Sequence, residues 1–512
     1  MKIKTLRIKN FRSYYQETTV NFEDLTAFVG KNDMGKSSIL EALDIFFNDS
    51  KGIIKLDKDD VNVGARENQE NEISIAVCFS ELPEQIIIDS TNETSLSNEY
   101  LLNSDGYLEI IKKYPNGGSA KVFIRAMHPT NPECADLLLK KDTELRRIID
   151  SKHIPCEDKT RNAVIRTAIW QHFSENLQLS TVDIDVTKGD TKSIWEKLQK
   201  YLPLYSLFQA DRKNSDGDSE VQDPLKEAVK EILRNEELQR KLDEVASTVE
   251  AKLREVSART LEKLQEMSPD IANTLTPIIP PPNSLKWADV FKSVSITSDE
   301  NIPINKRGSG SKRLILLNFF RAEVERRQGD TNAPSIIYAI EEPETSQHSD
   351  NQKKLIQALI ALASAANTQV IITTHSATIV KKLGFNNIRI IRMENEQKIV
   401  ENTLPHQLPY PSLNEVNYIA FSEISEEYHN ELYGYIEEQG LLNTYKNGKP
   451  TRPYIKLNKN GTTSNEQRTQ TEYIRHQIHH PENTHNPRFS DEELRVSIEM
   501  MRAFIQSQAS NP

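Results

Sequence analysis

The stretch that most constrains the fold lies near the start of the chain. Residues 30–37 read Gly-Lys-Asn-Asp-Met-Gly-Lys-Ser, a complete G-x-x-x-x-G-K-S pattern. An apolar stretch at 27–29 before it predicts a buried strand, and residues 39–47 after it predict a helix. Such a loop points backbone N–H groups at a phosphate, and the helix N-terminus adds partial positive charge. The sequence therefore predicts an α/β fold with a phosphate-binding P-loop.

The polar residues of this loop have distinct expected roles. The Lys36 ammonium can reach the β- and γ-phosphates of a nucleotide, and the Ser37 hydroxyl can hold Mg²⁺. Glycines allow the tight turn that brings the backbone close to the phosphates. The loop therefore predicts a nucleotide and Mg²⁺ as cofactors. The loop residues assigned to nucleotide binding are Gly30, Asn32, Gly35, Lys36, Ser37 and Ser38.

Two later stretches predict strands that end in polar residues beside the P-loop. The stretch 335–340 is mostly apolar and runs into Glu341 and Glu342, and 369–374 runs into His375. One carboxylate can hold Mg²⁺, directly or through water, and the next can orient or deprotonate the attacking water. The histidine can contact the γ-phosphate. Taken singly, an acidic turn after a buried strand and a structural histidine remain open alternatives.

Composition limits the classes of protein to consider. The 512 residues are enough for two or three domains, and the formal net charge of −11 argues against a surface coated for non-specific DNA binding. Three widely spaced cysteines suit a reducing compartment and give no zinc spacing. The N-terminus is charged and alternating, unlike a signal peptide, and no apolar run approaches a membrane span. We expect a cytoplasmic protein without a membrane segment.

The patterning divides the chain into a head, an insertion and a tail. Strands are expected within 1–29 and at 71–80, 108–111 and 121–124. A mostly helical, charged region follows, and apolar residues spaced by three and four predict a long helix over 225–267. That helix is either packed on the core or a short coiled-coil arm or dimer contact. The expected units are 1–130 and 286–402 for the head, 131–285 for the insertion and 415–512 for the tail.

The tail is expected to be entirely helical. Helices are predicted at 415–439 and 465–480, with a loop over 441–464 and a last helix after a capping box at 490–493. Arg475 and His480 lie near the end of the second helix and could face one cleft across a dimer. There arginine can stabilise phosphorane charge and histidine can move a proton. A chance pattern, a histidine metal site and a partner-binding tail remain open alternatives. Nearby basic residues that could bind phosphates are Lys446, Lys449, Arg452, Lys456 and Lys459.

Residues 1 to about 395 resemble ABC-type ATPases of the RecF, structural-maintenance (SMC) and OLD kind. The resemblance implies Walker A at 30–37, a signature at Gly308–Ser311 with Ser309 and Gly310 on nucleotide, and Walker B ending at Glu341. It also implies a catalytic Glu342 and a switch histidine at His375. The run Asn10-Phe11-Arg12 is similar to an N-terminal motif of this group, which would put Arg12 near phosphate.

Two departures from the family pattern stand out. Glu341 replaces the usual aspartate, and Ser311 replaces a signature glycine. The Q-loop is not assigned, and Asp57, Asp59 and Asp60 are only candidates. The fold expected from the resemblance is an α/β ABC-ATPase head, a mixed sheet with the P-loop, carrying a helical insertion and an all-α C-terminal domain. The family implies ATP and Mg²⁺ as cofactors. It also implies a homodimer or higher oligomer in which each ATP lies between two heads.

The tail and the whole chain carry further resemblances. Arg475 and His480 match the R-x₄-H form of HEPN ribonucleases, and no Toprim pattern of the OLD kind is present. The whole chain resembles antiphage ATPases of the Septu and retron-associated PtuA type, which work with a separately encoded HNH nuclease. Three hypotheses follow. The chain is a defence ATPase that regulates a partner nuclease, a self-contained ATP-gated ribonuclease, or a RecF-like DNA-repair ATPase. DNA or tRNA is a possible nucleic-acid partner.

Overall fold

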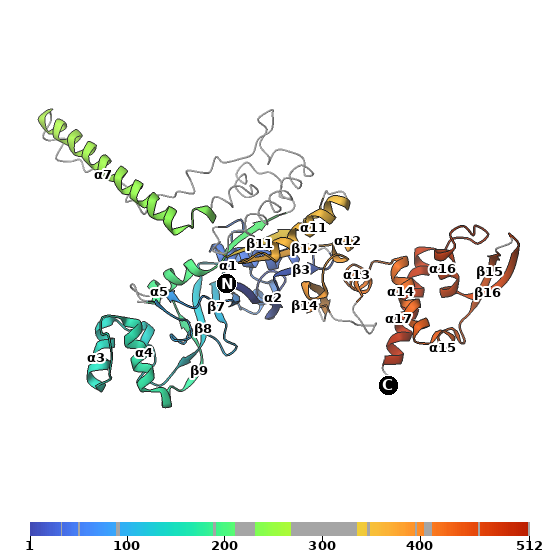
Figure 1. The fold of residues 1–512 in the computed structure, drawn as a ribbon, viewed down its shortest axis with the longest axis horizontal. Helices are drawn as coiled ribbons and strands as arrows, with labels where there is room; N and C mark the ends of the chain where they lie inside the picture. The colour runs from blue at the N-terminus through green and yellow to red at the C-terminus, as the bar shows by residue number, and fades with distance from the viewer. Residues whose placement is uncertain are drawn as a thin grey trace.

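Two six-stranded sheets and a separate tail make up the part of the chain that the structure describes (Figure 1). The computed structural model describes residues 1–31, 33–49, 52–88, 93–187, 191–209, 231–267, 335–345, 349–394, 397–403, 412–458 and 461–509. None of the described helices is both long and apolar enough to cross a membrane.

A mostly parallel sheet, the core sheet, carries the P-loop. Its order is β10 (Leu204–Phe208), β11 (Ile336–Glu341), β12 (Thr368–Thr374), β3 (Leu25–Val29), β13 (Ile388–Glu394) and β14 (Gln397–Asn402). Only the β13–β14 pair is antiparallel. Every residue of β3 and β12 is buried, as in parallel strands that are covered on both faces. The covering helices are α1 (Lys36–Asn48) on one face and α11 (Ser349–Ala363) on the other.

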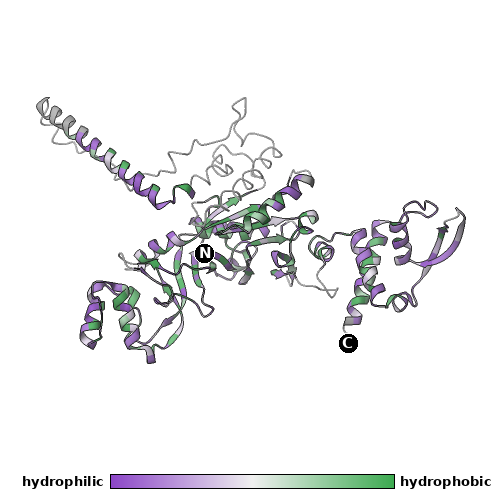
Figure 2. Cartoon of the chain, viewed as in Figure 1, coloured by the Kyte–Doolittle hydropathy of each residue, from purple (hydrophilic) through white to green (hydrophobic). Residues whose placement is uncertain are grey.

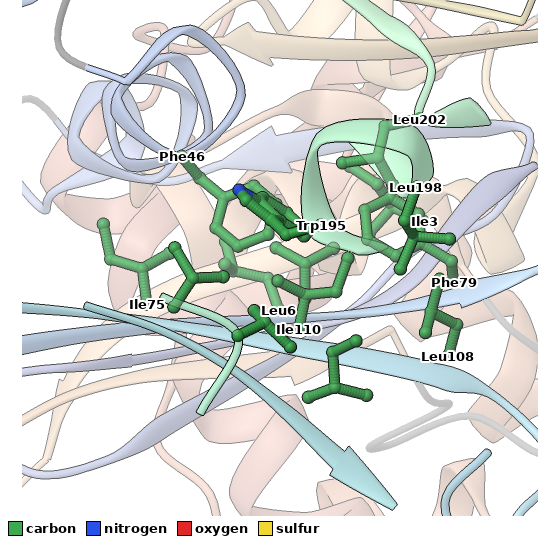
Figure 3. Close-up of a cluster of buried hydrophobic side chains, with 14 of the residues drawn as sticks. Ile3, Leu6, Phe46, Ile75, Phe79, Leu108, Ile110, Trp195, Leu198 and Leu202 are labelled. Atoms are coloured by element: carbon green, nitrogen blue, oxygen red, sulfur yellow. The ribbon is translucent and has the colours of Figure 1, made fainter. Parts of the chain in front are cut away.

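An antiparallel sheet packs on the α1 side of the core sheet. Its order is β2 (Thr18–Asn21), β1 (Lys2–Lys9), β4 (Glu72–Ser80), β7 (Leu108–Pro115), β8 (Lys121–Pro129) and β9 (Leu179–Asp185), which confirms the strands expected there. Figure 3 shows Leu6, Ile75 and Ile110 of this sheet facing Phe46 of α1 and Trp195 of α5 (Thr191–Leu198). This shared core fixes the helix that begins at the P-loop.

The region expected to be a helical insertion is partly a piece of the two sheets. It contains α3 (Asp142–Lys152), α4 (Asn162–His172) and α5, but β9 extends the antiparallel sheet and β10 the core sheet. A boundary at residue 131 therefore cuts through the head. The long helix α7 (Glu236–Met267) extends away from the sheets, and Figure 2 shows mainly hydrophilic residues along it.

Short elements connect these layers. They are the one-turn helices η1 (Lys58–Asp60), η2 (Leu137–Leu139), η3 (Ser174–Asn176), η4 (Gln199–Tyr201) and η7 (Phe385–Asn387), the short helices α2 (Val63–Glu67) and α12 (Ala377–Val380), and the pair β5 (Ile86–Ile87) and β6 (Glu93–Thr94).

The tail has its own hydrophobic core and is not all-helical. Helices α13 (Leu413–Phe421), α14 (Glu426–Glu438), α15 (Leu442–Lys446), α16 (Gln470–His479) and α17 (Asp491–Ala509) accompany a hairpin of β15 (Thr451–Leu457) and β16 (Thr463–Thr469). The expectation of an all-α tail, with a loop at 441–464 and a helix from 465, is wrong there. The β16 sequence alternates in burial but is almost entirely polar, so apolar periodicity gave no strand signal.

A buried polar chain runs through the tail core. His429 is fully buried, and its Nε2 lies 3.0 Å from Ser497 Oγ, which donates to Thr471 Oγ1 at 2.9 Å. Because Ser497 donates onward, it accepts from the Nε2–H of a neutral imidazole. Burial, assisted by the charge of Arg475, lowers the pKa of His429 to about 3. The folded tail therefore excludes a proton that the unfolded chain accepts below about pH 6.5.

This burial predicts that the tail loses stability in mild acid. Between about pH 6.5 and 3 the unfolded tail binds the His429 proton and the folded tail does not, so the free energy of unfolding falls by about 1.4 kcal/mol per pH unit. Burial also lowers the pKa of His476, which adds to the loss. Hydrogen exchange of α14 and α17 amides, corrected for intrinsic rates, measures the change between pH 7.5 and 5.5. His429→Gln is expected to flatten it, and exposed His485→Gln to leave it unchanged; equal slopes would contradict the assignment.

Candidate functional site

The P-loop turn depends on two glycines. Gly30 has φ +154° and Gly35 has φ +90°, backbone conformations that L side chains rarely adopt. A Cβ at Gly30 would lie 2.6 Å from the carbonyl oxygen of Ile391, and one at Gly35 would lie 2.9 Å from Ser13 Oγ. The strand β3 therefore leads through a tight turn into α1, which begins at Lys36. Asn32 lies outside the described residues, and Ser38 is in the first turn of α1.

Lys36 lies buried inside this turn. Its Nζ donates to the carbonyl oxygens of Gly30 and Lys31, each at 2.8 Å. Burial lowers the pKa of Lys36, and the carboxylates of Glu342 and Glu344 oppose that shift most strongly. The ammonium group is thus held against loop carbonyls within the field of several carboxylates. A nucleotide phosphate offers the same group stronger, charged acceptors.

Ser37 and Glu341 place two oxygen ligands side by side. Ser37 Oγ, in the first turn of α1, donates to Glu341 Oε1 at the end of β11. Mg²⁺ prefers hard oxygen donors and usually keeps several waters, so it needs only one or two protein ligands. These two side chains fit that requirement, although Glu341 is one methylene longer than the aspartate usual at this position. Ser37 and Glu341 are the residues that would hold the ion.

Glu342 and His375 lie together at the carboxyl ends of neighbouring strands. The parallel register pairs Glu341 with Thr373, so the residues that follow each strand emerge at the same edge. The Glu342 N–H donates to the Thr373 carbonyl oxygen at 3.1 Å, and Glu342 Oε1 lies 3.4 Å from His375 Nδ1. Glu342 has φ +41°, an unfavourable conformation for glutamate. A candidate base is therefore held in a fixed, strained position beside an imidazole that is 46% exposed.

Glu344 is a further residue of this cluster, one whose role the sequence did not indicate. Its side chain is buried, and Oε1 accepts from Thr374 Oγ1 at 2.7 Å and from the His375 N–H at 2.9 Å. The sequence does show Glu344, as the third acidic residue of the run Glu-Glu-Pro-Glu at 341–344. Periodicity does not distinguish a buried acid in a turn from an exposed one.

Arg12 lies between two acidic side chains near the P-loop. Its Nε donates to Asp60 Oδ1 at 2.8 Å, and its guanidinium also contacts Glu41 of α1. Of the three aspartates offered for the Q-loop, Asp60 is the one that holds Arg12, while Asp57 caps η1. The arginine expected near phosphate is therefore bound to carboxylates in this structure.

Gln209 is a second residue that sequence reasoning missed. It follows β10, the strand parallel to β11, and its Nε2 lies 3.3 Å from Glu41 Oε1. Its position puts an uncharged amide at the same carboxyl edge as Glu341. The sequence could have indicated this position, because Gln209 directly follows the apolar stretch 204–208. The signature residues Ser309 and Gly310 lie outside the described residues, as does the rest of Gly308–Ser311.

The tail candidates do not meet within one chain. Arg475 lies over the Tyr433 ring, 4.3 Å from its centroid, and donates to Asn430 Oδ1 at 3.3 Å. His480 instead contacts Glu482, with 3.1 Å between Nδ1 and Oε1, and stacks near His476. Arg475 thus faces α14, whereas His480 lies beyond the last turn of α16. No group of three or more potential metal ligands is assembled among the described residues, the tail histidines included.

The basic residues of the tail mostly have partners of opposite charge. Lys446 pairs with Glu472, Arg452 with Glu493 and Lys456 with Glu466. Lys449 lies over the Tyr445 ring, and Lys459 is outside the described residues. These pairs neutralise much of the charge that was expected to bind phosphates.

The fold of this chain is similar to several solved structures of SMC heads. Solved structures similar to this chain include an SMC head domain from Thermotoga maritima, with 13% identity, a TM-score of 0.34, and coverage of 79% of this chain and 100% of that one. An Smc head bound to the C-winged helix domain of ScpA has 13% identity and a TM-score of 0.35. That match covers 78% of this chain and 98% of the other. A third structure is an Smc head with an extended coiled coil, bound to the C-terminal domain of ScpA derived from Pyrococcus furiosus. It has 12% identity and a TM-score of 0.38, and the match covers 78% of this chain and 95% of the other.

Comparison of the sequence itself gives the family. The comparison with curated proteins found no match to this chain. The family model described as AAA ATPase domain matches residues 1–380. Because that match spans 380 of the 512 residues, the chain belongs to the AAA ATPase domain family.

Proposed function

We propose that the chain binds ATP with Mg²⁺ at the P-loop edge and hydrolyses it there. The observation that carries this proposal is the convergence of Lys36, Ser37, Glu341, Glu342 and His375 at adjoining ends of α1, β11 and β12. A bound Mg²⁺ supplies positive charge that neutralises the phosphates. Phosphate release by the purified chain, measured with ATP and Mg²⁺ and again with excess chelator, tests the proposal.

The side chains divide the reaction among them. Lys36 leaves the carbonyls of Gly30 and Lys31 and binds the β- and γ-phosphates. Glu342 orients the attacking water and takes its proton as the oxygen bonds to the γ-phosphorus and the bond to the bridging oxygen of ADP breaks. His375, beside Glu342, contacts the γ-phosphate. The distance of 3.4 Å between Glu342 Oε1 and His375 Nδ1 supports this division of roles.

We infer further that the heads act as an ABC-type pair, in a homodimer or a higher oligomer. The order of motifs along the chain supports this, because a signature segment follows the insertion and would complete the site of a second head. ATP would then lie between the P-loop of one subunit and the signature of the other. Light scattering of a Glu342→Gln variant is expected to give a larger mass with ATP than with ADP, and equal masses would count against the pairing.

We propose a role as the sensor and regulatory subunit of a bacterial antiphage system whose partner is an HNH nuclease. The resemblance of the sequence to antiphage ATPases motivates this role. A tail with its own core and mostly paired charges favours protein docking over phosphate binding. Phage challenge of bacteria that express the chain with a neighbouring HNH gene tests it. Protection that needs both genes and an intact Glu342 supports the role, and equal protection by the nuclease alone refutes it.

We predict that a single chain does not cleave RNA, because Arg475 and His480 contact different residues within it. Arg475→Ala is expected to lower the free energy of unfolding of the tail by about 1–2 kcal/mol, because it loses the Tyr433 stacking and the Asn430 hydrogen bond. His480→Ala is expected to change it by less than about 0.5 kcal/mol. Hydrogen exchange and incubation with total tRNA measure both properties. Cleavage by the wild type that both variants abolish, with tail protection intact, would establish the ribonuclease instead.

A further inference from the structure

Glu344 joins the ends of the two strands that carry the candidate base and the histidine. It lies two residues after Glu342, across Pro343, and its residue exposure is only 4%. Its Oε1 accepts two hydrogen bonds, from the Thr374 hydroxyl at 2.7 Å and from the His375 main-chain N–H at 2.9 Å. Both donors belong to the end of β12, so the carboxylate of one strand end fixes the backbone of the next.

Burying this carboxylate is costly. An ionised group removed from water needs hydrogen bonds to both oxygens, and each unsatisfied one costs free energy. Glu344 Oε2 is buried and has no hydrogen-bond partner among the described residues. An incompletely satisfied buried acid at this edge therefore points to function.

The geometry of His375 shows what the arrangement achieves. The imidazole Nδ1 lies 3.4 Å from Glu342 Oε1 and 3.6 Å from Glu344 Oε1, so the ring lies between two carboxylates. Glu342 is held on its side by its N–H bond to Thr373 and by the Thr345 hydroxyl, 3.3 Å from Oε2. The main chain of His375 is held by Glu344. Without that bond the residue following β12 loses its fixed position relative to Glu342.

We propose that Glu344 is a positioning residue for ATP hydrolysis, which acts by holding His375 against Glu342. The inference rests on the proposed ATPase function and adds a residue to it. Because the hydrogen bonds of Glu344 go to the end of β12, its loss affects kcat much more than KM or ATP affinity. Misplacing a group by about 1 Å can lower a rate by about 100-fold.

Substitutions at 344 separate hydrogen bonding from charge. Glu344→Ala removes both accepted bonds, and we expect kcat to fall about 50- to 100-fold with KM changed less than about threefold. Glu344→Gln keeps an acceptor oxygen in the same place and removes only the charge, so it is expected to retain kcat within about threefold. Equal and large losses in both variants would overturn the hydrogen-bond mechanism. Thermal melting and fluorescent-ATP binding establish that each variant is folded and binds nucleotide.

A double-mutant cycle with His375→Ala tests whether Glu344 acts through the histidine. If it does, Glu344→Ala added to His375→Ala lowers kcat by less than about twofold further. An additional loss of 50-fold or more would show an independent role and overturn the proposal, as would wild-type kcat in Glu344→Ala. A wild-type protein without ATP turnover would instead refute the proposed function, so the two failures are distinguishable.

Discussion

Replacing Glu342 with glutamine is expected to lower kcat for ATP hydrolysis about 1,000-fold and to leave the ATP dissociation constant within about threefold, as loss of a general base does. Glutamine has nearly the shape of glutamate, so the strained φ of +41° and the main-chain bond to Thr373 can persist. What disappears is the carboxylate that orients the water and accepts its proton. The variant should therefore accumulate bound ATP where the wild type accumulates ADP.

Phosphate release and chromatography of the bound nucleotide measure this effect. Asp105→Asn is a matched control, because it removes one negative charge from an exposed turn that precedes β7. The control should hydrolyse ATP at the wild-type rate. Turnover by Glu342→Gln at more than about a tenth of the wild-type rate would exclude Glu342 as the general base.

Replacing Lys36 with alanine is expected to weaken ATP binding about 100-fold. The ammonium can donate charge-assisted hydrogen bonds to two phosphates, and losing about 3 kcal/mol of such contacts raises Kd by that factor. The variant also leaves the carbonyls of Gly30 and Lys31 without the bonds they accept from Nζ. Some loss of thermal stability should therefore accompany the loss of affinity.

Titration with a fluorescent ATP analogue measures the affinity. Lys31→Ala is the matched control, since Lys31 is an exposed lysine of the same loop. It should bind ATP within about threefold of the wild type, because an exposed charge contributes little. Similar losses of affinity in the two variants would mean that general loop charge, and not the buried Lys36, holds the nucleotide.

The sequence predicted those parts of the head whose structure depends on residues close together in the chain. A G-x-x-x-x-G-K-S loop between an apolar strand and a helix sets its own turn, and parallel strands bring their carboxyl ends to one edge. Glu341, Glu342 and His375 could therefore be placed beside Lys36 from the order and spacing of the motifs. The strands expected at 71–80 and 108–111 were confirmed for the same reason, since their apolar residues recur in the spacing of a strand.

What could not be predicted depends on contacts between distant segments. Glu344 and Gln209 acquire their positions from the strand that lies next to their own, and sequence spacing does not reveal that neighbour. The β15–β16 hairpin was missed because its strands are polar, and β9 because a strand at a sheet edge needs little apolar patterning. The packing of Arg475 against Tyr433 is likewise a contact between distant segments, and its expected chemical role stays a prediction.

Steady-state phosphate release by the wild-type chain tests the central claim most directly. The account predicts Mg²⁺-dependent formation of ADP and phosphate well beyond one turnover per chain, with Lys31→Ala active and Lys36→Ala inactive at low ATP concentration. Release that stops at or below one phosphate per chain in every oligomeric fraction, or turnover that Lys36→Ala fully retains, would contradict the assignment of ATP hydrolysis to this site.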